Sequence, residues 1–443
     1  MSGLSSTLTE RLSTGVQTPP AALPRLLSGI QPRGALTLEQ HLAVHGPVPS
    51  DAAARGRRRA RERASMLVDE IERAGLLGRG GAAFPTATKL RTVAAAGTRR
   101  RAVVVANGAE GEPASLKDRT LLESLPHLVL DGAILAAQAV GTEEVIVCVC
   151  ESAGAGIDSI ARAIEERAAA GSERSRGLRL ETVPSHYVAG QESALVSFLN
   201  GGSAKPAFTP PLPFERGVRN RPTLVDNIET LAHIALIARH GARWFRELGT
   251  PSQPGSALVT VSGAISHPGV YEIEHGALVG GYAGSWIAGR LLSGVALSNE
   301  HLASHGASLG AGVVLLLSAD ACPVAESARL ARWLAGQSTR QCGPCVHGLD
   351  ALASTLEELA GGIAGARVGT RIGQLTALIS RRGACGHPDG ALKVILSALD
   401  VFEAEFAEHA RHGPCAACSR APELPLPELP LSDPRIRESE GRR

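Results

Sequence analysis

Three short runs of apolar, β-branched residues alternate with helical segments in the first half of the chain. The runs cover residues 102–106, 144–150 and 178–183, and helical spacing covers residues 121–140 and 155–169. Strands separated by helices favour an α/β fold with a mainly parallel sheet and helices on both faces. Ligands of such sheets bind at the carboxyl ends of the strands. We therefore expect a binding site where an acidic loop, NGAEGEP, follows the first run.

The rest of the chain changes character several times. Residues 1–50 are rich in Pro, Ser, Thr and Leu, helical spacing covers 223–240, and short strands with turns follow residue 256. From 324 to 409 the apolar spacing is helical, and the end of the chain is charged and Pro-rich. We predict five parts: a loosely ordered N-terminal arm (1–64), an α/β domain (65–250), a small β-grasp-like domain (251–320), a helical bundle (321–410) and a disordered tail (411–443).

The charge balance and the apolar pattern exclude several classes of protein. The 443 residues include 45 Lys and Arg against 43 Asp and Glu, a net charge of +2. This gives no electrostatic reason to expect nucleic acid or an anionic membrane as a partner. No window holds about 18 uninterrupted apolar residues, and the start of the chain lacks an apolar signal segment. We expect a cytoplasmic protein without direct membrane insertion, whose eight cysteines are metal ligands, redox groups or core residues.

One group of cysteines has the spacing of a metal site. Cys342 and Cys345 are three residues apart, and Cys385 follows forty residues later. This pattern suits a four-iron cluster or zinc; a thioredoxin-type dithiol and purely structural cysteines are the alternatives. The dithiol requires a preceding strand, whereas residues 324–335 are predicted to be helical. A fourth ligand could be one of three further side chains or an outside group; the three are His347, His387 and Cys322.

The other cysteines form two pairs. Cys148 and Cys150 lie two apart on an apolar strand, so both point to one face, and we predict small core residues. Cys415 and Cys418 form a second CxxC near the end of the chain. Taken alone, this pair is either unremarkable or contributes to a metal site or cluster.

Three further motifs could hold a ligand. Residues 78–81 (GRGG) could cradle a phosphate with backbone N–H groups, although such runs also form plain turns. Glu110 and Glu112 follow the first strand. A strand-to-helix turn, HYVAGQESAL, contains Tyr187, Gln191 and Glu192.

Together and in this order, the motifs resemble the flavoprotein subunit of respiratory NADH:quinone oxidoreductase. The same subunit type occurs in NAD-linked hydrogenases and formate dehydrogenases. The resemblance covers roughly residues 65–408. The residues that carry it are GRGGAAFPT (78–86), Lys89, NGAEGEP (107–113), KDR (117–119), YVAGQE (187–192), PT (222–223), DNIET (226–230) and the cysteines at 342, 345 and 385.

The resemblance implies a Rossmann-like FMN domain, a small β-grasp domain and a C-terminal helical bundle with a four-iron cluster. It implies an NADH dehydrogenase-like oxidoreductase that passes electrons from NAD(P)H through FMN to a 4Fe–4S cluster and a partner protein. That partner would be a small iron–sulfur subunit or a ferredoxin, and any membrane association would be made through partners. The residues implied for FMN are Gly78, Gly80, Gly81, Lys89, Asn107, Glu112, Tyr187, Gly190 and Asn227; those for NAD(H) are Phe84 and Glu192; those for the cluster are Cys342, Cys345 and Cys385.

The sequence also departs from the family pattern. The family's cluster motif is CxxCxxC, and here Thr339 stands in place of the first cysteine. Ala109 and Gln191 replace acidic residues of the family's flavin and nucleotide loops. A Lys and aromatic residues that contact NADH in the family correspond here to Thr209, Leu212 and Thr92. A second hypothesis is therefore a non-catalytic or NADH-independent relative that serves as an electron-relay or scaffold module.

Overall fold

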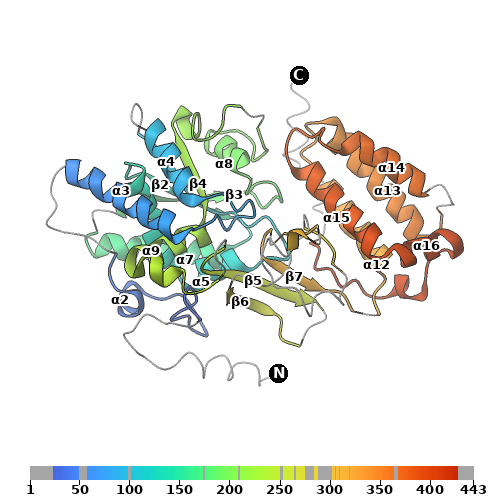
Figure 1. Cartoon of the computed structure of the whole chain (residues 1–443), viewed down its shortest axis with the longest axis horizontal. Coiled ribbons are helices and arrows are strands. Elements are labelled where there is room, and N and C mark those ends of the chain that lie inside the picture. Colours follow the sequence, from blue (N-terminus) through green and yellow to red (C-terminus); the bar gives the residue numbers. More distant parts are fainter. Residues whose placement is uncertain are drawn as a thin grey trace. The chain divides into compact units, whose positions relative to one another are not determined.

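The computed structural model divides into two compact units, Met1–Leu315 and Leu316–Arg443, which are described separately. Figure 1 shows the ribbon with its element labels. The structure describes residues 23–48, 57–97, 101–172, 175–207, 210–249, 253–263, 266–274, 284–287, 302–304, 306–308, 310–318, 320–363 and 368–427.

A four-stranded parallel sheet forms the centre of the first unit. Its strands are β1 (Val103–Gly108), β2 (Val145–Cys150), β3 (Leu178–Val183) and β4 (Thr223–Asn227), in the order β3-β2-β1-β4. The first three strands confirm the alternation seen in the sequence. The fourth corrects the prediction of a helix over 223–240, because five strand residues run directly into helix α9 (Ile228–Phe245).

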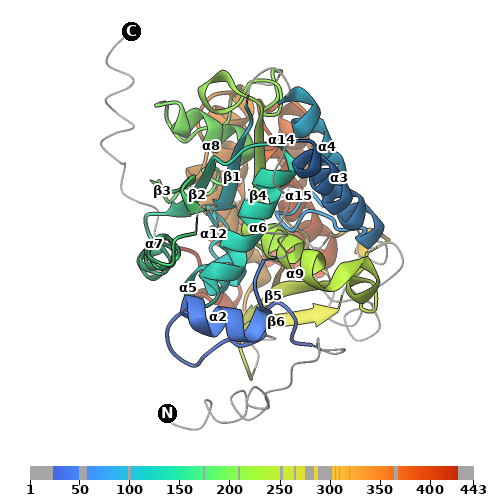
Figure 2. The ribbon, with the colours of Figure 1, turned by 90° about the vertical axis from the view of Figure 1, so that its left-hand side faces the viewer.

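Both faces of this sheet are buried, because alternate side chains of each strand point to opposite sides. Val104 and Ala106 pack in one core with α9 and α6 (Pro126–Ala139), which cover one face of the sheet in Figure 2. Val103 and Val105 belong to a second core with α8 (Glu192–Leu199). The predicted core cysteines of β2 are buried, which confirms their assignment.

In the part of this unit that the structure describes, the other α-helices are α2 (Leu38–His45), α3 (Arg57–Ala74), α4 (Thr86–Ala96), α5 (Lys117–Ser124) and α7 (Gly154–Ala169). The single helix predicted over 121–140 is wrong: α5 and α6 meet at a bend of 99°. Pro126 causes the break, since it lacks an amide N–H and occupies the first turn of α6.

The N-terminal arm is more ordered than predicted over residues 23–48. Leu26 and Leu36 are buried in the main core. The Glu272 carboxylate accepts hydrogen bonds from the amides of Arg25, Leu26 and Leu27, at 2.7, 2.9 and 3.0 Å. The arm is therefore packed into the unit where it is described.

A second sheet in this unit is built from β5 (Ser256–Gly263), β6 (Gly269–Glu274) and β7 (Val313–Leu316), in the order β6-β5-β7. The strands β5 and β6 pair antiparallel. Much of the stretch 275–301 lies outside the described residues. The β-grasp assignment stays a prediction.

The second unit is helical, as the pattern over 324–409 predicts. Its long helices are α12 (Pro323–Gly336), α13 (Leu349–Ala360), α14 (Val368–Ile379), α15 (His387–Val401) and α16 (Glu403–His412). A disordered tail from residue 411 is contradicted as far as residue 427. There Leu424 is buried, and the Glu326 carboxylate accepts hydrogen bonds from the amides of Glu423 and Leu424, at 2.9 and 3.2 Å.

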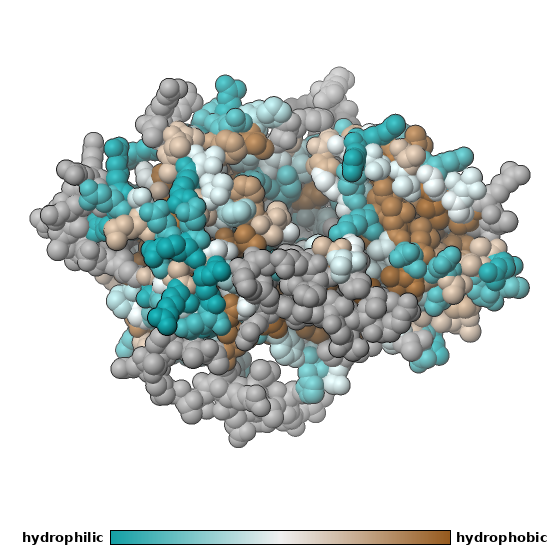
Figure 3. All heavy atoms as spheres, viewed as in Figure 1, coloured by the Kyte–Doolittle hydropathy of each residue, from teal (hydrophilic) through white to brown (hydrophobic). Residues whose placement is uncertain are grey.

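Among the described residues, no single helix is long and apolar enough to cross a membrane; α5 and α6 meet the length and composition criteria only as a bent pair. Apolar residues cover part of the face of the helical unit that Figure 3 presents. Among the described residues of that unit, the exposed large apolar side chains are Val346, Ile363, Leu378 and Leu396.

Candidate flavin and metal sites

The strand order creates a topological switch point at the carboxyl edge of the parallel sheet, between β1 and β4. From β1 the chain continues to β2 and β3 on one side, and β4 later adds to the other side of β1. Asn107 at the end of β1 and Asn227 at the end of β4 are register partners. Ligands of doubly wound sheets bind where the strand order reverses in this way. Two of the predicted flavin residues therefore lie at the position where the topology places a ligand.

The glycine-rich loop lies over the end of β4. The loop is closed by a hydrogen bond of 2.9 Å from the Gly78 amide to the Phe84 carbonyl. A Cβ added to Gly80 would lie 3.4 Å from Cβ of Asn227. Gly81 has a φ of +102°, which favours glycine at this position. The loop backbone thus approaches the strand ends closely, as a phosphate-cradling loop must.

A cavity opens beside this loop, with glycine backbone on two sides. Its lining includes Gly78 and Gly81 from the loop, Gly310 and Gly312 from the segment before β7, and the side chain of Lys117. Glycines leave backbone groups accessible, so this lining suits a ligand that is held by main-chain atoms.

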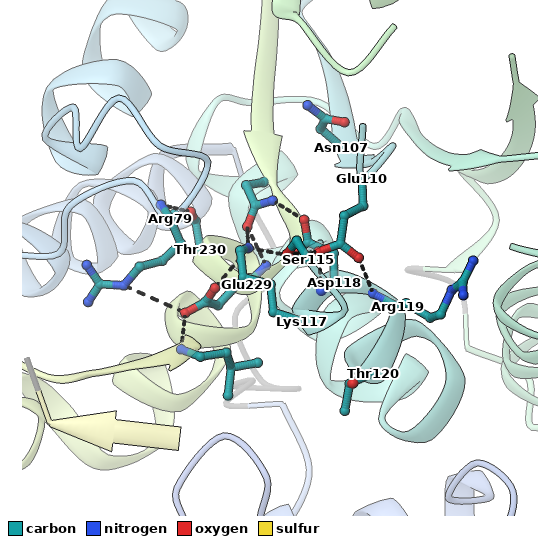
Figure 4. A network of polar contacts seen from close by, with 12 residues as sticks. Arg79, Asn107, Glu110, Ser115, Lys117, Asp118, Arg119, Thr120, Glu229 and Thr230 are labelled. Atoms are coloured by element: carbon teal, nitrogen blue, oxygen red, sulfur yellow. Dashed lines mark hydrogen bonds and ion pairs between the residues drawn. The ribbon is translucent and has the colours of Figure 1, made fainter. Parts of the chain in front are cut away.

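A buried network of charges forms the polar wall of this cavity (Figure 4). The Lys117 ammonium contacts carboxylate oxygens of Asp118 at 2.7 Å and of Glu229 at 3.0 Å. Asn227 donates from Nδ2 to Asp118 at 2.6 Å, and its Oδ1 accepts from the Glu229 amide at 3.0 Å. The Arg79 amide donates to Thr230 Oγ1 at 2.9 Å. The network joins the glycine loop, α5 and the start of α9 in one rigid arrangement.

Burial and neighbouring charges shift the pKa values in and around this network. Burial works against the charge on Lys117, but the carboxylates of Asp118 and Glu229 outweigh it and raise its pKa. Burial and then the Asp118 carboxylate raise the pKa of Glu110 to about 7, against an ordinary 4.5. Burial raises the pKa of Asp226 in β4 to about 6. Two carboxyl groups near the strand ends are thus brought toward neutral pH.

The loop after β1 packs directly against the turn before α8. A Cβ on Gly190 would lie 2.2 Å from the carbonyl oxygen of Ala109, and one on Gly111 would lie 2.2 Å from the carbonyl oxygen of Tyr187. Asn107 donates from Nδ2 to the Gly190 carbonyl at 2.8 Å. These backbone contacts bring the predicted flavin residues of the two loops together.

Gln191 has a local structural role that its motif did not indicate. Its side-chain oxygen accepts hydrogen bonds from the Ser193 and Ala194 amides, at 2.9 and 3.1 Å, and so caps the start of α8. Gln191 is uncharged where the family has a carboxylate, but its side-chain oxygen still accepts these hydrogen bonds. This departure from the family pattern therefore preserves the N-terminal cap of α8.

The residues expected to contact NAD(H) are more exposed. Phe84 has 52% of its surface exposed. Glu192 forms an ion pair of 3.3 Å with Lys89, whose ammonium also bonds to the Val225 carbonyl. Leu212 is exposed and presents no ring. Thr209 lies outside the described residues.

The three predicted cluster cysteines lie in turns of the helical unit. Cys342 precedes a short π-helical turn, η3 (Pro344–Gly348), which contains the buried Cys345, and Cys385 lies just before α15. Burial raises the pKa of Cys345 to about 11, and the neighbouring sulfurs of Cys342 and Cys385 add to this effect. The three thiols therefore act on one another electrostatically, and Thr339 is buried nearby in the chain.

The three side chains predicted as a possible fourth cluster ligand lie in different surroundings. The Nε2 atom of His387 lies 2.9 Å from the Leu334 carbonyl and is engaged there. Cys322 belongs to another group, because its sulfur lies 3.4 Å from that of Cys418. His347 is exposed.

A second set of metal-type ligands was not predicted as one site. Cys322, His409, Cys415 and Cys418 place their ligand atoms within 4.8 Å of one another. Only the CxxC spacing of Cys415 and Cys418 signals it in the sequence.

Two family models match the chain at these sites. The model described as the Nuo51 FMN-binding domain matches residues 71–236, and that of the NADH-ubiquinone oxidoreductase-F iron-sulfur binding region matches residues 325–409. The chain belongs to the family of NADH-quinone oxidoreductase F-subunits. The first match contains the glycine loop and the switch point of the sheet, and the second contains the three predicted cluster cysteines.

Individual relatives agree with this placement. An NADH-quinone oxidoreductase F-subunit of Rhizobium meliloti is 29% identical over 79% of this chain and 90% of its own. NADP-reducing hydrogenase subunit HndC of Solidesulfovibrio fructosivorans is 28% identical over 79% of this chain and 77% of its own. A solved NAD+-reducing [NiFe]-hydrogenase in the H2-reduced state matches with a TM-score of 0.70 and 29% identity, over 79% of this chain and 63% of that chain. The match thus spans less than two thirds of the hydrogenase chain.

Against the F-subunit pattern, the cysteine that is missing from the cluster motif is the most consequential departure. The side chain at that position, Thr339, is buried, and a hydroxyl does not ionise near neutral pH. The iron–sulfur region of this member therefore offers three thiolates from its own motif.

Proposed function

We propose that the protein is an electron-transfer oxidoreductase that passes electrons from NAD(P)H through FMN to an iron–sulfur cluster and a partner protein. The observation that carries the proposal is the meeting of Asn107, Asn227 and the glycine loop at the switch point of the sheet. The family membership supports the same function. A bound flavin would supply the conversion between hydride transfer and single-electron steps.

The residues around the switch point suit FMN. The glycine loop offers a backbone cradle for a phosphate, and the buried Lys117 and Arg79 lie beside it with their carboxylate partners. We propose that nine residues hold the flavin, either directly or by shaping the cradle: Gly78, Gly80, Gly81, Lys89, Asn107, Glu112, Tyr187, Gly190 and Asn227. Gly190 acts in this set through its backbone, since it locks the Asn107 loop in place.

We propose that Cys342, Cys345 and Cys385 hold the iron–sulfur cluster. Cys345 is buried, Cys342 and Cys385 are partly buried in turns beside it, and the neighbouring sulfurs raise the pKa of Cys345; these features support one shared site. Thiolates are the usual protein ligands of such clusters. Three thiolates leave one iron without a cysteine, so we expect this cluster to lose iron in air more readily than one held by four.

For the nicotinamide donor, we propose binding near Phe84 and Glu192 at the open side of the flavin site. Phe84 is half exposed, and Glu192 is held by Lys89 at the start of α8. An exposed ring can stack on a ligand. Contacts expected in the family are absent at Thr92 and Leu212, so this site should be weak.

The partner is proposed to be an iron–sulfur protein, either a small subunit or a ferredoxin. Relatives carry names that mark them as subunits of larger assemblies. The exposed apolar side chains of the helical unit are the kind of surface that such contacts bury.

The visible spectrum of anaerobically purified protein, taken before and after addition of NADH, tests this function. We expect flavin bands that bleach with NADH, and extraction followed by chromatography should identify FMN and not FAD. Lys89→Met should lower the flavin content, whereas Lys393→Met, at an exposed position of α15, serves as the matched control and should leave it unchanged. Protein that binds no flavin would contradict the proposal and favour a scaffold role.

A further inference from the structure

Four side chains from distant parts of the helical unit converge outside the proposed iron–sulfur motif. Cys322 caps the start of α12, and His409 lies in the last turn of α16. Cys415 immediately precedes a short 3-10 turn, η4 (Ala416–Ser419), and Cys418 lies within it. All four ligand atoms lie within 4.8 Å of one another. Three thiols and an imidazole are a ligand set that zinc uses in structural sites.

The distances match a single tetrahedral metal ion. Cys322 Sγ lies 3.4 Å from Cys418 Sγ and 3.5 Å from His409 Nε2. Cys418 Sγ lies 3.2 Å from His409 Nε2 and 3.7 Å from Cys415 Sγ. In a tetrahedron with Zn–S bonds of about 2.3 Å and a Zn–N bond of about 2.1 Å, ligand atoms lie about 3.5–3.8 Å apart. The four side chains are thus close to the spacing that one ion requires.

The imidazole is oriented for binding. His409 Nδ1 lies 2.8 Å from the Glu405 carbonyl, so it carries the proton and donates to that oxygen. This leaves Nε2 without a proton, with the sulfurs of Cys322 and Cys418 at 3.5 and 3.2 Å and the Cys415 amide donating to it at 3.4 Å. Histidine ligands of metal ions are commonly held by such a hydrogen bond from the other ring nitrogen.

The backbone around the site is arranged to close it. Gly413, with a φ of +81°, ends α16 and turns the chain so that Cys415 and Cys418 return to His409. Beyond the site, the amides of Glu423 and Leu424 bond to Glu326 on α12. The segment that follows α16 is therefore folded back onto the start of α12.

From these observations we infer that Cys322, His409, Cys415 and Cys418 form a structural zinc site that is separate from the proposed iron–sulfur cluster. In a four-iron cluster each thiolate binds a different iron, so its cysteine sulfurs lie farther apart than ligands of one ion do. Four protein ligands fill a tetrahedral ion completely and leave no open position for a substrate. The zinc holds the start of α12, the end of α16 and the chain beyond it together.

Metal analysis of the full-length protein, purified without added chelator, tests this inference by comparing the zinc and iron contents of variants at the two sites. We expect about one zinc per chain in addition to iron. Cys415→Ser and His409→Ala should each lower the zinc content at least about fivefold and keep iron and flavin. Cys342→Ser is the matched control and should lower iron while zinc stays at the wild-type level. Zinc that persists in Cys415→Ser, or iron in place of zinc at the wild-type site, would overturn the inference.

A second measurement does not depend on how the variants fold. Cys415 is exposed, so an alkylating reagent should reach it unless a metal holds the sulfur. We expect iodoacetamide to modify Cys415 and Cys418 of the wild-type protein at least about tenfold faster after zinc removal by a chelator, as followed by mass spectrometry. Equal rates with and without the chelator would count against a bound metal.

Discussion

Substitution of Gly190 by alanine should disrupt the flavin site through the backbone. The new Cβ would lie 2.2 Å from the Ala109 carbonyl oxygen, whereas an ordinary contact needs at least 3.4 Å, so one loop must move by about 1.2 Å. Overpacking of this kind costs about 1–3 kcal/mol. The hydrogen bond of 2.8 Å from Asn107 to Gly190 would not survive the shift and adds about 1 kcal/mol. We therefore expect the free energy of unfolding to fall by about 2–4 kcal/mol.

Two assays check this expectation. Thermal unfolding should show a Tm lowered by several degrees, and titration of flavin-free protein should show FMN affinity reduced at least about tenfold, the equivalent of about 1.4 kcal/mol. Gly154→Ala is the matched control, because nothing lies within 4 Å of its added Cβ at the start of α7. If Gly190→Ala retains the Tm and the FMN affinity of that control, the packing argument is wrong.

Three further predictions concern the cluster, the donor and pH. Thr339→Cys should restore a fourth thiolate and slow the loss of iron in air, as followed by absorbance, whereas an unchanged rate would show that the residue faces away from the cluster. NADH should reduce the flavin slowly, and it should bind roughly 30- to 1,000-fold more weakly than in a relative with the full contact set. The reason is that two missing rings at Thr92 and Leu212 and a missing Lys remove about 2–4 kcal/mol of binding free energy. Stopped-flow reduction that saturates at low micromolar NADH would refute this. Since the pKa of Glu110 is raised to about 7 from an ordinary 4.5, its folded state holds a proton more tightly than the unfolded state does. The stabilisation that Glu110 contributes below pH 4.5 should therefore be lost as pH rises through about 7. Urea unfolding measures the difference in free energy of unfolding between wild type and Glu110→Gln, and a difference that stays constant over this pH range would contradict the assignment.

The strands of the parallel sheet show where sequence patterns suffice and where they fail. The apolar runs of β1 and β2 are flanked by loops, so their boundaries are visible in the sequence. β4 has only five residues and passes into the apolar helix α9 without a turn, so one helix was predicted over both. The break before Pro126 was visible as a proline, but the continuous apolar spacing on both sides concealed it.

The sites show the same limit at longer range. Motifs such as the glycine loop can be recognised in the sequence, because the residues that form the site are neighbours along the chain. The contact between Gly190 and Ala109 depends on how two loops meet, and the grouping of Cys322 with His409 joins residues 87 positions apart. Neither can be recognised from local spacing.

The anchoring of the N-terminal arm has a consequence for where this protein can be cut. The family match begins at residue 71, but Leu26 and Leu36 lie in the core of the first unit. A chain that starts at the family boundary would leave a hollow in that core. It would also remove three of the donors to the Glu272 carboxylate, which would keep the Ser256 hydroxyl as its hydrogen-bond partner. The shortest version that folds should therefore begin before Arg25, and truncation at residue 71 should yield an aggregating product.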